Sequence, residues 1–166
     1  LINSEILNNK NLSAKMSLNV KDITNINELK DLKLKISIEE GNIGFSGSTI
    51  MWKNDLKIIF DESFLSIDEE EINLIGTIDL EFKDITDFYS SFQIQKKYRK
   101  DIKKIQINYV YNFNDKSFYF DNPKINNKQN ESIEEFLEVF NSKKIRVFNK
   151  IKFKNFVNNF FSVYAG

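Results

Sequence analysis

Apolar and polar residues alternate through most of residues 32–82, and only short turn signals interrupt the pattern. In the longest run, residues 72–82, every second residue from Ile72 to Phe82 is apolar or glycine, and most of the others are polar. A period of two is typical of a β-strand with one apolar face and one polar face. Several such strands in series predict a long sheet with a continuous apolar face. The function of the protein then depends on what this face contacts.

The same alternation occurs in residues 12–20 and again in residues 105–113, which a turn separates from a returning strand at 118–120. Apolar residues at helical spacing instead predict helices from Asp84 or Thr86 to about residue 97, over 132–141 and over 150–164. The sequence therefore predicts a single β-rich α+β domain over residues 1–166. We expect an antiparallel meander that forms an open, twisted sheet or groove, with two or three short amphipathic helices.

Composition excludes several kinds of chemistry. The 166 residues include 24 basic and 24 acidic side chains, so no net charge favours nucleic acid, and neither histidine nor cysteine occurs. Thiol catalysis, imidazole bases and thiolate or histidine metal sites are thereby excluded. The sequence also contains no phosphate loop, dinucleotide fingerprint or nucleophile elbow. We predict a protein that is not an enzyme and that uses no metal or cofactor.

Two charged segments have alternative interpretations. The acidic run at residues 68–71 could bind calcium, but it lacks the ligand spacing and glycine of an EF-hand loop, which favours a solvated turn. The basic residues between Lys96 and Lys104 could meet phosphates of a nucleic acid or of lipid headgroups. Only one aromatic residue, Tyr98, lies among them, which favours a charged helix end and loop.

The last predicted helix carries a stripe of aromatic and aliphatic residues at steps of three and one. One interpretation is that this stripe packs against the sheet. The other is that it lies in a membrane interface, with lysines of the first turn near anionic headgroups. The candidate residues for membrane contact are Phe153, Phe156, Phe160 and Phe161.

The segment from Ile36 to Gly47, followed by residues 65–80 with their I-x-L-x-G-x-I-D-L strand (its first Ile being Ile72), resembles the C-terminal part of the AsmA-like family. This family includes TamB- and YhdP-type proteins of Gram-negative envelopes. The resemblance covers roughly residues 32–95, and it brings no catalytic residue with it. It implies a long sheet folded into an open groove, in a protein that moves phospholipids between the inner and outer membranes and contributes to outer-membrane biogenesis.

The resemblance also implies a periplasmic location, with an anchor in the inner membrane outside this chain. No targeting segment precedes Leu1, so we expect a C-terminal fragment of a longer protein. The expected partners are phospholipid acyl chains, together with a membrane surface or envelope proteins, and not nucleic acid.

A lipid conduit requires an apolar wall without fixed polar sites, because acyl chains must slide along it. Alternating strands provide such a wall on one face. The candidate lipid-binding residues that line the groove are Leu56, Ile58, Phe60, Ile72, Leu74, Ile78, Leu80, Ile105, Ile107 and Tyr109. The alternative functions are a structural or protein-interaction β-domain whose core is fully covered and a small carrier with a closed pocket.

Overall fold

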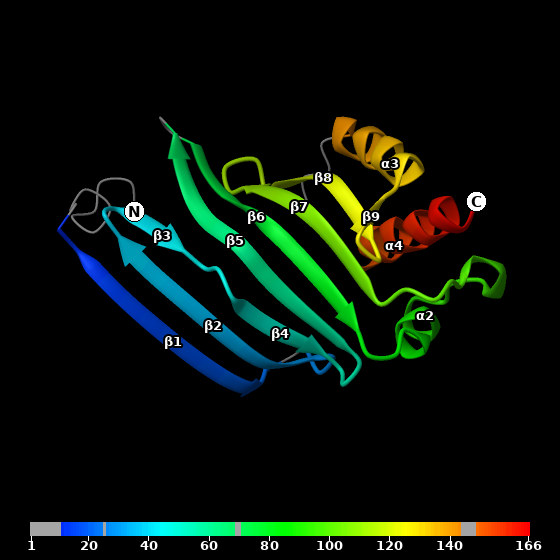
Figure 1. Ribbon diagram of the computed structural model, residues 1–166, viewed down its shortest axis with the longest axis horizontal. Coiled ribbons are helices and arrows are strands. Elements are labelled where there is room, and N and C mark those ends of the chain that lie inside the picture. Colours follow the sequence, from blue (N-terminus) through cyan, green and yellow to red (C-terminus); the bar gives the residue numbers. More distant parts are fainter. Residues whose placement is uncertain (1–10, 25, 69–70, 144–148) are drawn as a thin grey trace.

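The computed structural model describes residues 11–24, 26–68, 71–143 and 149–166, and within them nine strands form one antiparallel sheet (Figure 1). This confirms the predicted β-rich α+β class with an antiparallel meander. The strands are β1 (Ser13–Asp22), β2 (Leu29–Glu39), β3 (Asn42–Gly44), β4 (Ser48–Trp52), β5 (Leu56–Asp68), β6 (Glu71–Phe82), β7 (Lys104–Asn112), β8 (Ser117–Ile125) and β9 (Lys128–Gln129).

Strand order follows the chain almost throughout. The sheet runs β1-β2-β3-β5-β6-β7-β8-β9, and β4 pairs with β2 and β5 beside β3. The segment of residues 43–53 is divided into β3 and β4. Gly47 lies between them at a φ of 77°, which glycine adopts at little cost, and its N–H donates to the carbonyl of Phe60. Gly47 therefore marks the bend that separates the two strands.

Three helices occur among the described residues: α2 (Thr86–Phe92), α3 (Glu131–Ser142) and α4 (Lys150–Ala165). The side chains of Asn130 and Asn149 cap α3 and α4 by accepting from the N–H groups of Ile133 and Lys152. In Figure 1 the helices gather beside β7, β8 and β9 and the adjoining end of β6, whereas β1, β2 and β3 extend away from them. The helices therefore cover only part of the sheet.

The helix predicted to reach residue 97 ends at Phe92 instead. Gln93 adopts a left-handed conformation with a φ of 57°, which terminates α2, and a short 3₁₀ turn follows at Lys96–Tyr98. The Asn158 side chain of α4 donates to the carbonyl of Phe92 at 2.9 Å. At the other end, the Asp84 carboxylate accepts from the Thr86 N–H at 2.8 Å, which holds the pKa of Asp84 below its ordinary value.

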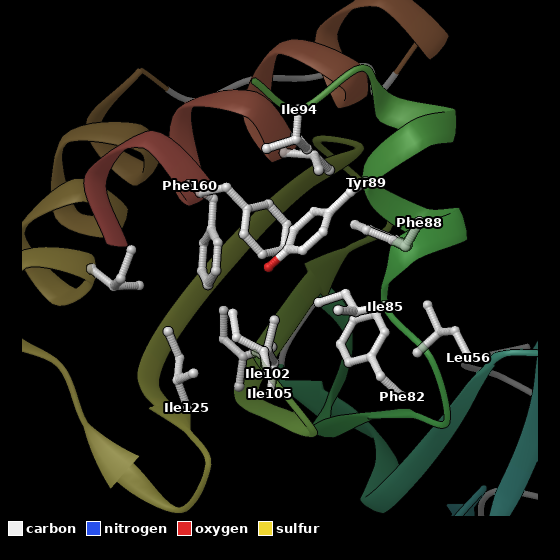
Figure 2. Close-up of a cluster of buried hydrophobic side chains, with 14 of the residues drawn as sticks. Leu56, Phe82, Ile85, Phe88, Tyr89, Ile94, Ile102, Ile105, Ile125 and Phe160 are labelled. Atoms are coloured by element: carbon white, nitrogen blue, oxygen red, sulfur yellow. The ribbon is translucent and has the colours of Figure 1, made fainter. Parts of the chain in front are cut away.

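The hydrophobic core lies between the helices and the sheet (Figure 2). Ile102 and Ile133 are fully buried, and the Phe161 side chain of α4 packs edge-on against Phe88 and Tyr89 of α2. The other buried members include Leu56, Phe82, Ile94, Ile105, Ile107, Ile125, Leu137, Val157 and Phe160. Most of these residues come from the helices, from β7 and from the adjoining strand ends. The core therefore lies on one face of the sheet, beneath the helices.

The opposite face of the sheet carries polar cross-strand pairs on β6 and β7. Asp79 accepts from Lys104 at 2.7 Å and from Gln106 at 2.9 Å, and Thr77 donates to Asn108 at 3.2 Å. These polar side chains satisfy one another across the strands. An apolar row of Phe64, Ile75, Val110 and Tyr119 crosses the same face, so the polar pairs occupy only part of it.

The two edges of the sheet differ in length. β9 has only two residues and leads directly into α3, whereas β1 has ten residues. Among the described residues β1 pairs with β2 alone.

Candidate functional site: a partly covered apolar face

The candidate site is the apolar face of the sheet, and the strand register defines it. Residues directly opposite in an antiparallel pair carry their side chains on the same face. Leu56 pairs with Phe82, Ile58 with Leu80 and Phe60 with Ile78, so one parity of β5 and β6 faces the helices. The same face continues through Ile105 and Ile107 of β7.

One row of directly opposed apolar residues crosses seven strands on this face. Ala14 of β1 opposes Ile38 of β2, Ile38 opposes Ile43 of β3, and Ile43 opposes Leu65 of β5. Leu65 then opposes Leu74 of β6, which opposes Tyr111 of β7, and Tyr111 opposes Phe118 of β8. None of these residues belongs to the core beneath the helices. The apolar face therefore extends well beyond the part that the helices cover.

Exposure increases along this face toward β1. Met16 is 62% exposed and Leu18 is 54% exposed, and their partners Ile36 and Leu34 in β2 are partly exposed. We call the part that no described helix covers the open face. Its members are Met16, Leu18, Val20, Leu32, Leu34, Ile36, Ile38, Ile50, Phe60, Leu65, Ile67, Ile72 and Leu74. Met16 and Leu18 are exposed and the other members are partly exposed, and a contiguous apolar surface that reaches solvent in this way is typical of a binding site.

Two serines on this face have their hydroxyl groups satisfied within the protein. The Ser48 hydroxyl accepts from the backbone N–H of Lys35 at 2.9 Å and donates to the Lys35 carbonyl at 3.2 Å. The Ser63 hydroxyl donates to the Asp61 carbonyl at 2.9 Å. Both serines are buried, at 2% and 0% exposed. Their polar groups therefore offer no fixed site to a ligand on the face.

A bulge in β5 places Ser63 over Gly76. The register between β5 and β6 shifts between Asp61 and Phe64, and Glu62 in the bulge has a φ of 45°. A Cβ atom on Gly76 would lie 2.3 Å from Ser63 Oγ and 2.7 Å from Ser63 Cα. The glycine of the I-x-L-x-G-x-I-D-L strand is thus required by a close approach within the sheet.

The ten predicted groove residues fall into three groups. Leu56, Ile105, Ile107 and Tyr109 are buried beneath the helices or within the bulge, at 2–7% exposed, so they are core residues and not groove-lining residues. Ile58, Ile78 and Leu80 are partly buried and pack against the same core. Phe60, Ile72 and Leu74 lie on the open face.

The prediction placed core residues in the groove because alternation identifies which face of a strand is apolar. It does not indicate how much of that face the helices cover. The residues that the prediction missed are chiefly Met16, Leu18, Leu34, Ile36 and Ile50. The signal for most of them was present in the alternation of residues 12–20 and 32–38.

The predicted membrane contacts are mostly excluded by burial. Phe160 and Phe161 are 6% and 2% exposed, and Phe156 packs against Phe120 and Phe140. Only Phe153 is exposed, at 42%, and its ring contacts Phe92 of α2. The aromatic stripe of α4 therefore faces the sheet and the other helices, which was the alternative interpretation.

The charged segments do not assemble into a binding centre within the described residues. Glu69 and Glu70 of the acidic run lie outside those residues, and the described part of the chain contains no cluster of three carboxylates that could hold a metal ion. Near the basic segment, Arg99 donates to the Ile94 carbonyl at 2.9 Å and Lys103 pairs with Asp101 at 3.1 Å. The cleft beside them is lined by charged residues of both signs, unlike the closed apolar pocket of a carrier.

No described helix is long and apolar enough to cross a membrane. Comparison with known proteins found no matching family model, no curated relative and no similar solved structure.

Proposed function

We propose that the open face binds the acyl chains of phospholipids. The protein would then serve as a non-catalytic segment of an AsmA-like envelope protein that moves phospholipids between the inner and outer membranes. The observation that carries this proposal is that the apolar face continues past the helices as far as the edge strand, where Met16 and Leu18 are more than half exposed. A fully covered sheet would have favoured the structural alternative.

The dimensions of the open face suit an acyl chain. The open face crosses β1, β2, β4, β5 and β6, and neighbouring strands lie about 4.8 Å apart, so it spans roughly 19 Å. One acyl chain occupies about half of the ~30 Å hydrocarbon core of a bilayer. The open face is therefore wide enough for one extended chain.

The chemistry of the face favours sliding over fixed docking. Apolar side chains attract hydrocarbon in proportion to buried area and without directional preference. The Ser48 and Ser63 hydroxyls are engaged in hydrogen bonds within the protein, so neither can anchor a headgroup at one position. A surface of this kind stabilises an acyl chain at many equivalent positions, as a conduit requires.

Co-purified lipid provides the first test. Native mass spectrometry of the protein isolated from cells should detect bound phospholipid. Transfer of a fluorescent phospholipid between phosphatidylcholine vesicles should then accelerate in the presence of the protein. Zwitterionic vesicles minimise contributions from the lysines.

Two double variants of β2 test whether lipid binds on the open face. Leu34→Asn/Ile36→Asn places amides on the open face, whereas Lys33→Asn/Lys35→Asn changes the opposite face of the same strand. Each unpaired amide should weaken acyl-chain binding by about 1–2 kcal/mol, roughly tenfold. The control pair should bind lipid as the wild type does. The absence of lipid from the wild type, together with equal transfer by both pairs, would contradict the proposal and favour a structural or protein-interaction domain.

A further inference from the structure

The outer edge of β1 is long and regular, and no described strand covers it. β1 pairs with β2 from Ser13–Glu39 to Asp22–Lys30 with no register shift within β1, and no other described strand pairs with it. The only proline in the sequence is Pro123, in β8. Natural sheets usually protect such an edge with charged side chains, a proline, a bulge, a short strand or a covering element. Within the described chain β1 carries only the first of these devices, in Lys15, Lys21 and Asp22, and Lys15 is paired with Glu39 of β2. The ten-residue edge of β1 is therefore a candidate site for strand addition.

A second copy of β1 fits this edge in an antiparallel register centred on Ser17, which combines the longest overlap with the absence of like-charge pairs. With Ser17 opposite Ser17 of the partner subunit, Met16 lies opposite the partner's Leu18 and Ala14 opposite the partner's Val20. The apolar rows of both strands then share one face, as the period of two requires. The overlap extends over nearly the whole strand, from Ser13 to Lys21.

Charge favours the same register. Lys15 lies opposite the partner's Asn19, and Lys21 lies opposite the partner's Ser13, so no like charges meet. A shift that places Leu18 opposite the partner's Leu18 would bring Lys15 against the partner's Lys21, which is destabilising. In the favoured register Lys15 can keep its 3.0 Å ion pair with Glu39 in β2.

We propose that β1 is the interface for a second copy of this chain. Two copies pair edge to edge through β1, and their sheets join into one sheet with a single continuous open face. The pairing depends on backbone hydrogen bonds and on the register of β1, not on the binding of lipid, so it can be tested separately from the proposed function.

Cysteine crosslinking tests the register directly, because the chain contains no native cysteine. Ser17→Cys should form a disulfide-linked dimer under mild oxidation, since the two introduced thiols would lie directly opposite each other. Lys35→Cys is the matched control, because Lys35 is the partner of Ser17 one strand further in. Its two copies would be three strand spacings apart, roughly 14 Å, which is beyond the ~7 Å Cα separation that a disulfide bridges.

Mixed crosslinking fixes the direction of pairing. Ser13→Cys and Lys21→Cys should form a heterodimer when mixed, and neither should form a homodimer alone. A Ser17→Cys protein that stays monomeric, or a Lys35→Cys protein that crosslinks equally well, would overturn the proposal.

Substitution of Asn19 tests the charge interaction with Lys15 of the partner subunit across the proposed interface. Asn19→Glu places a carboxylate opposite the partner's Lys15, and Asn19→Lys places a cation there. Both changes lie on the face opposite the lipid site. The dimer dissociation constant, from light scattering over a range of concentrations, should fall roughly fivefold for Asn19→Glu and rise roughly fivefold for Asn19→Lys. Equal dissociation constants for the two variants, or a monomer at every concentration, would contradict the pairing.

Discussion

The Tyr109 hydroxyl donates a hydrogen bond to the Ser63 hydroxyl, 3.0 Å away, above the backbone of Gly76. The Ser63 hydroxyl in turn donates to the Asp61 carbonyl, so the bond ties the bulge of β5 to β7 across β6. Tyr109 is 2% exposed and Ser63 is fully buried. This contact lies where the covered part of the apolar face meets the open face, and it fixes the local shape of the sheet there.

Gly76→Ala should destabilise the protein by about 2–3 kcal/mol, because the new methyl group would overlap Ser63, including its backbone Cα. Urea denaturation would measure the loss. Gly44→Ala is the matched control, since the nearest atom at Gly44 is the Ser37 Oγ, the end of a side chain that can rotate away. An equal loss in both variants would show that general strand propensity, and not the contact with Ser63, requires glycine at position 76.

Stability should fall at alkaline pH because of two buried tyrosines. Burial raises the pKa of Tyr89 and the pKa of Tyr109 above the ordinary value, against the opposing effect of their hydrogen bonds. The unfolded chain therefore ionises first, near pH ~10. The stability contributed by these groups is complete below that pH and is lost as the pH rises through the folded pKa values.

Tyr109→Phe isolates one of these two groups. At neutral pH the variant should lose about 1 kcal/mol, the value of one hydrogen bond. Above pH ~10 its free energy of unfolding should fall less steeply than that of the wild type. Urea titrations at several alkaline pH values would measure both slopes, and identical slopes would contradict the role assigned to Tyr109.

Phe161→Ala should destabilise the fold by about 3–5 kcal/mol, because it removes a buried ring that contacts Phe88, Tyr89 and Phe160. Ile151→Ala, on the same helix, should change stability by no more than about 0.5 kcal/mol, since Ile151 is 73% exposed. Thermal denaturation of both variants would compare the two faces of α4. A small effect of Phe161→Ala would argue against the packing of the aromatic stripe on the core.

Amide hydrogen exchange should be uneven across the sheet. β7 and the end of β6 lie beneath the helices and should exchange slowly. At concentrations below the dimer dissociation constant β1 has one neighbouring strand among the described residues and exposed side chains, so it should exchange fastest. Mass spectrometry of peptides from the two regions would measure the difference. Added phospholipid should slow exchange in β1 and β2 if the open face binds acyl chains, with little change in β7.

The sequence predicted the positions of the strands and helices better than it predicted which strands the helices cover. The period-two runs located most strands, and the stripes at 132–141 and 150–164 located α3 and α4 to within a residue or two of their ends. Alternation depends only on which face of a strand is apolar, so it assigned the buried Leu56 and the partly exposed Phe60 to the same kind of surface. Whether a helix covers a strand depends on contacts between distant segments, such as Phe161 with Phe88, and no local pattern carries that information.

Local sequence patterns could not predict the bulge in β5 or the residue at which α2 ends, for a similar reason. Glu62 and Gln93 adopt positive φ values although neither residue type favours them. The hydrogen bonds of Ser63 at the bulge and of Asn158 at Phe92 stabilise these conformations, and both connect segments that are far apart in the sequence.

The two-residue length of β9 has a consequence for assembly. β9 covers only Lys124 and Ile125 of β8, but the Asn141 side chain of α3 hydrogen-bonds to the N–H and the carbonyl of Phe120, and Pro123 has no N–H to donate. This edge therefore cannot accept a strand as long as β1. A sheet with only one receptive edge can join a single neighbour through a two-fold axis, and the joined pair then presents β9 at both outer ends. Growth stops at two copies, so the exposed strand does not lead to the open-ended fibres that long unprotected edges otherwise promote.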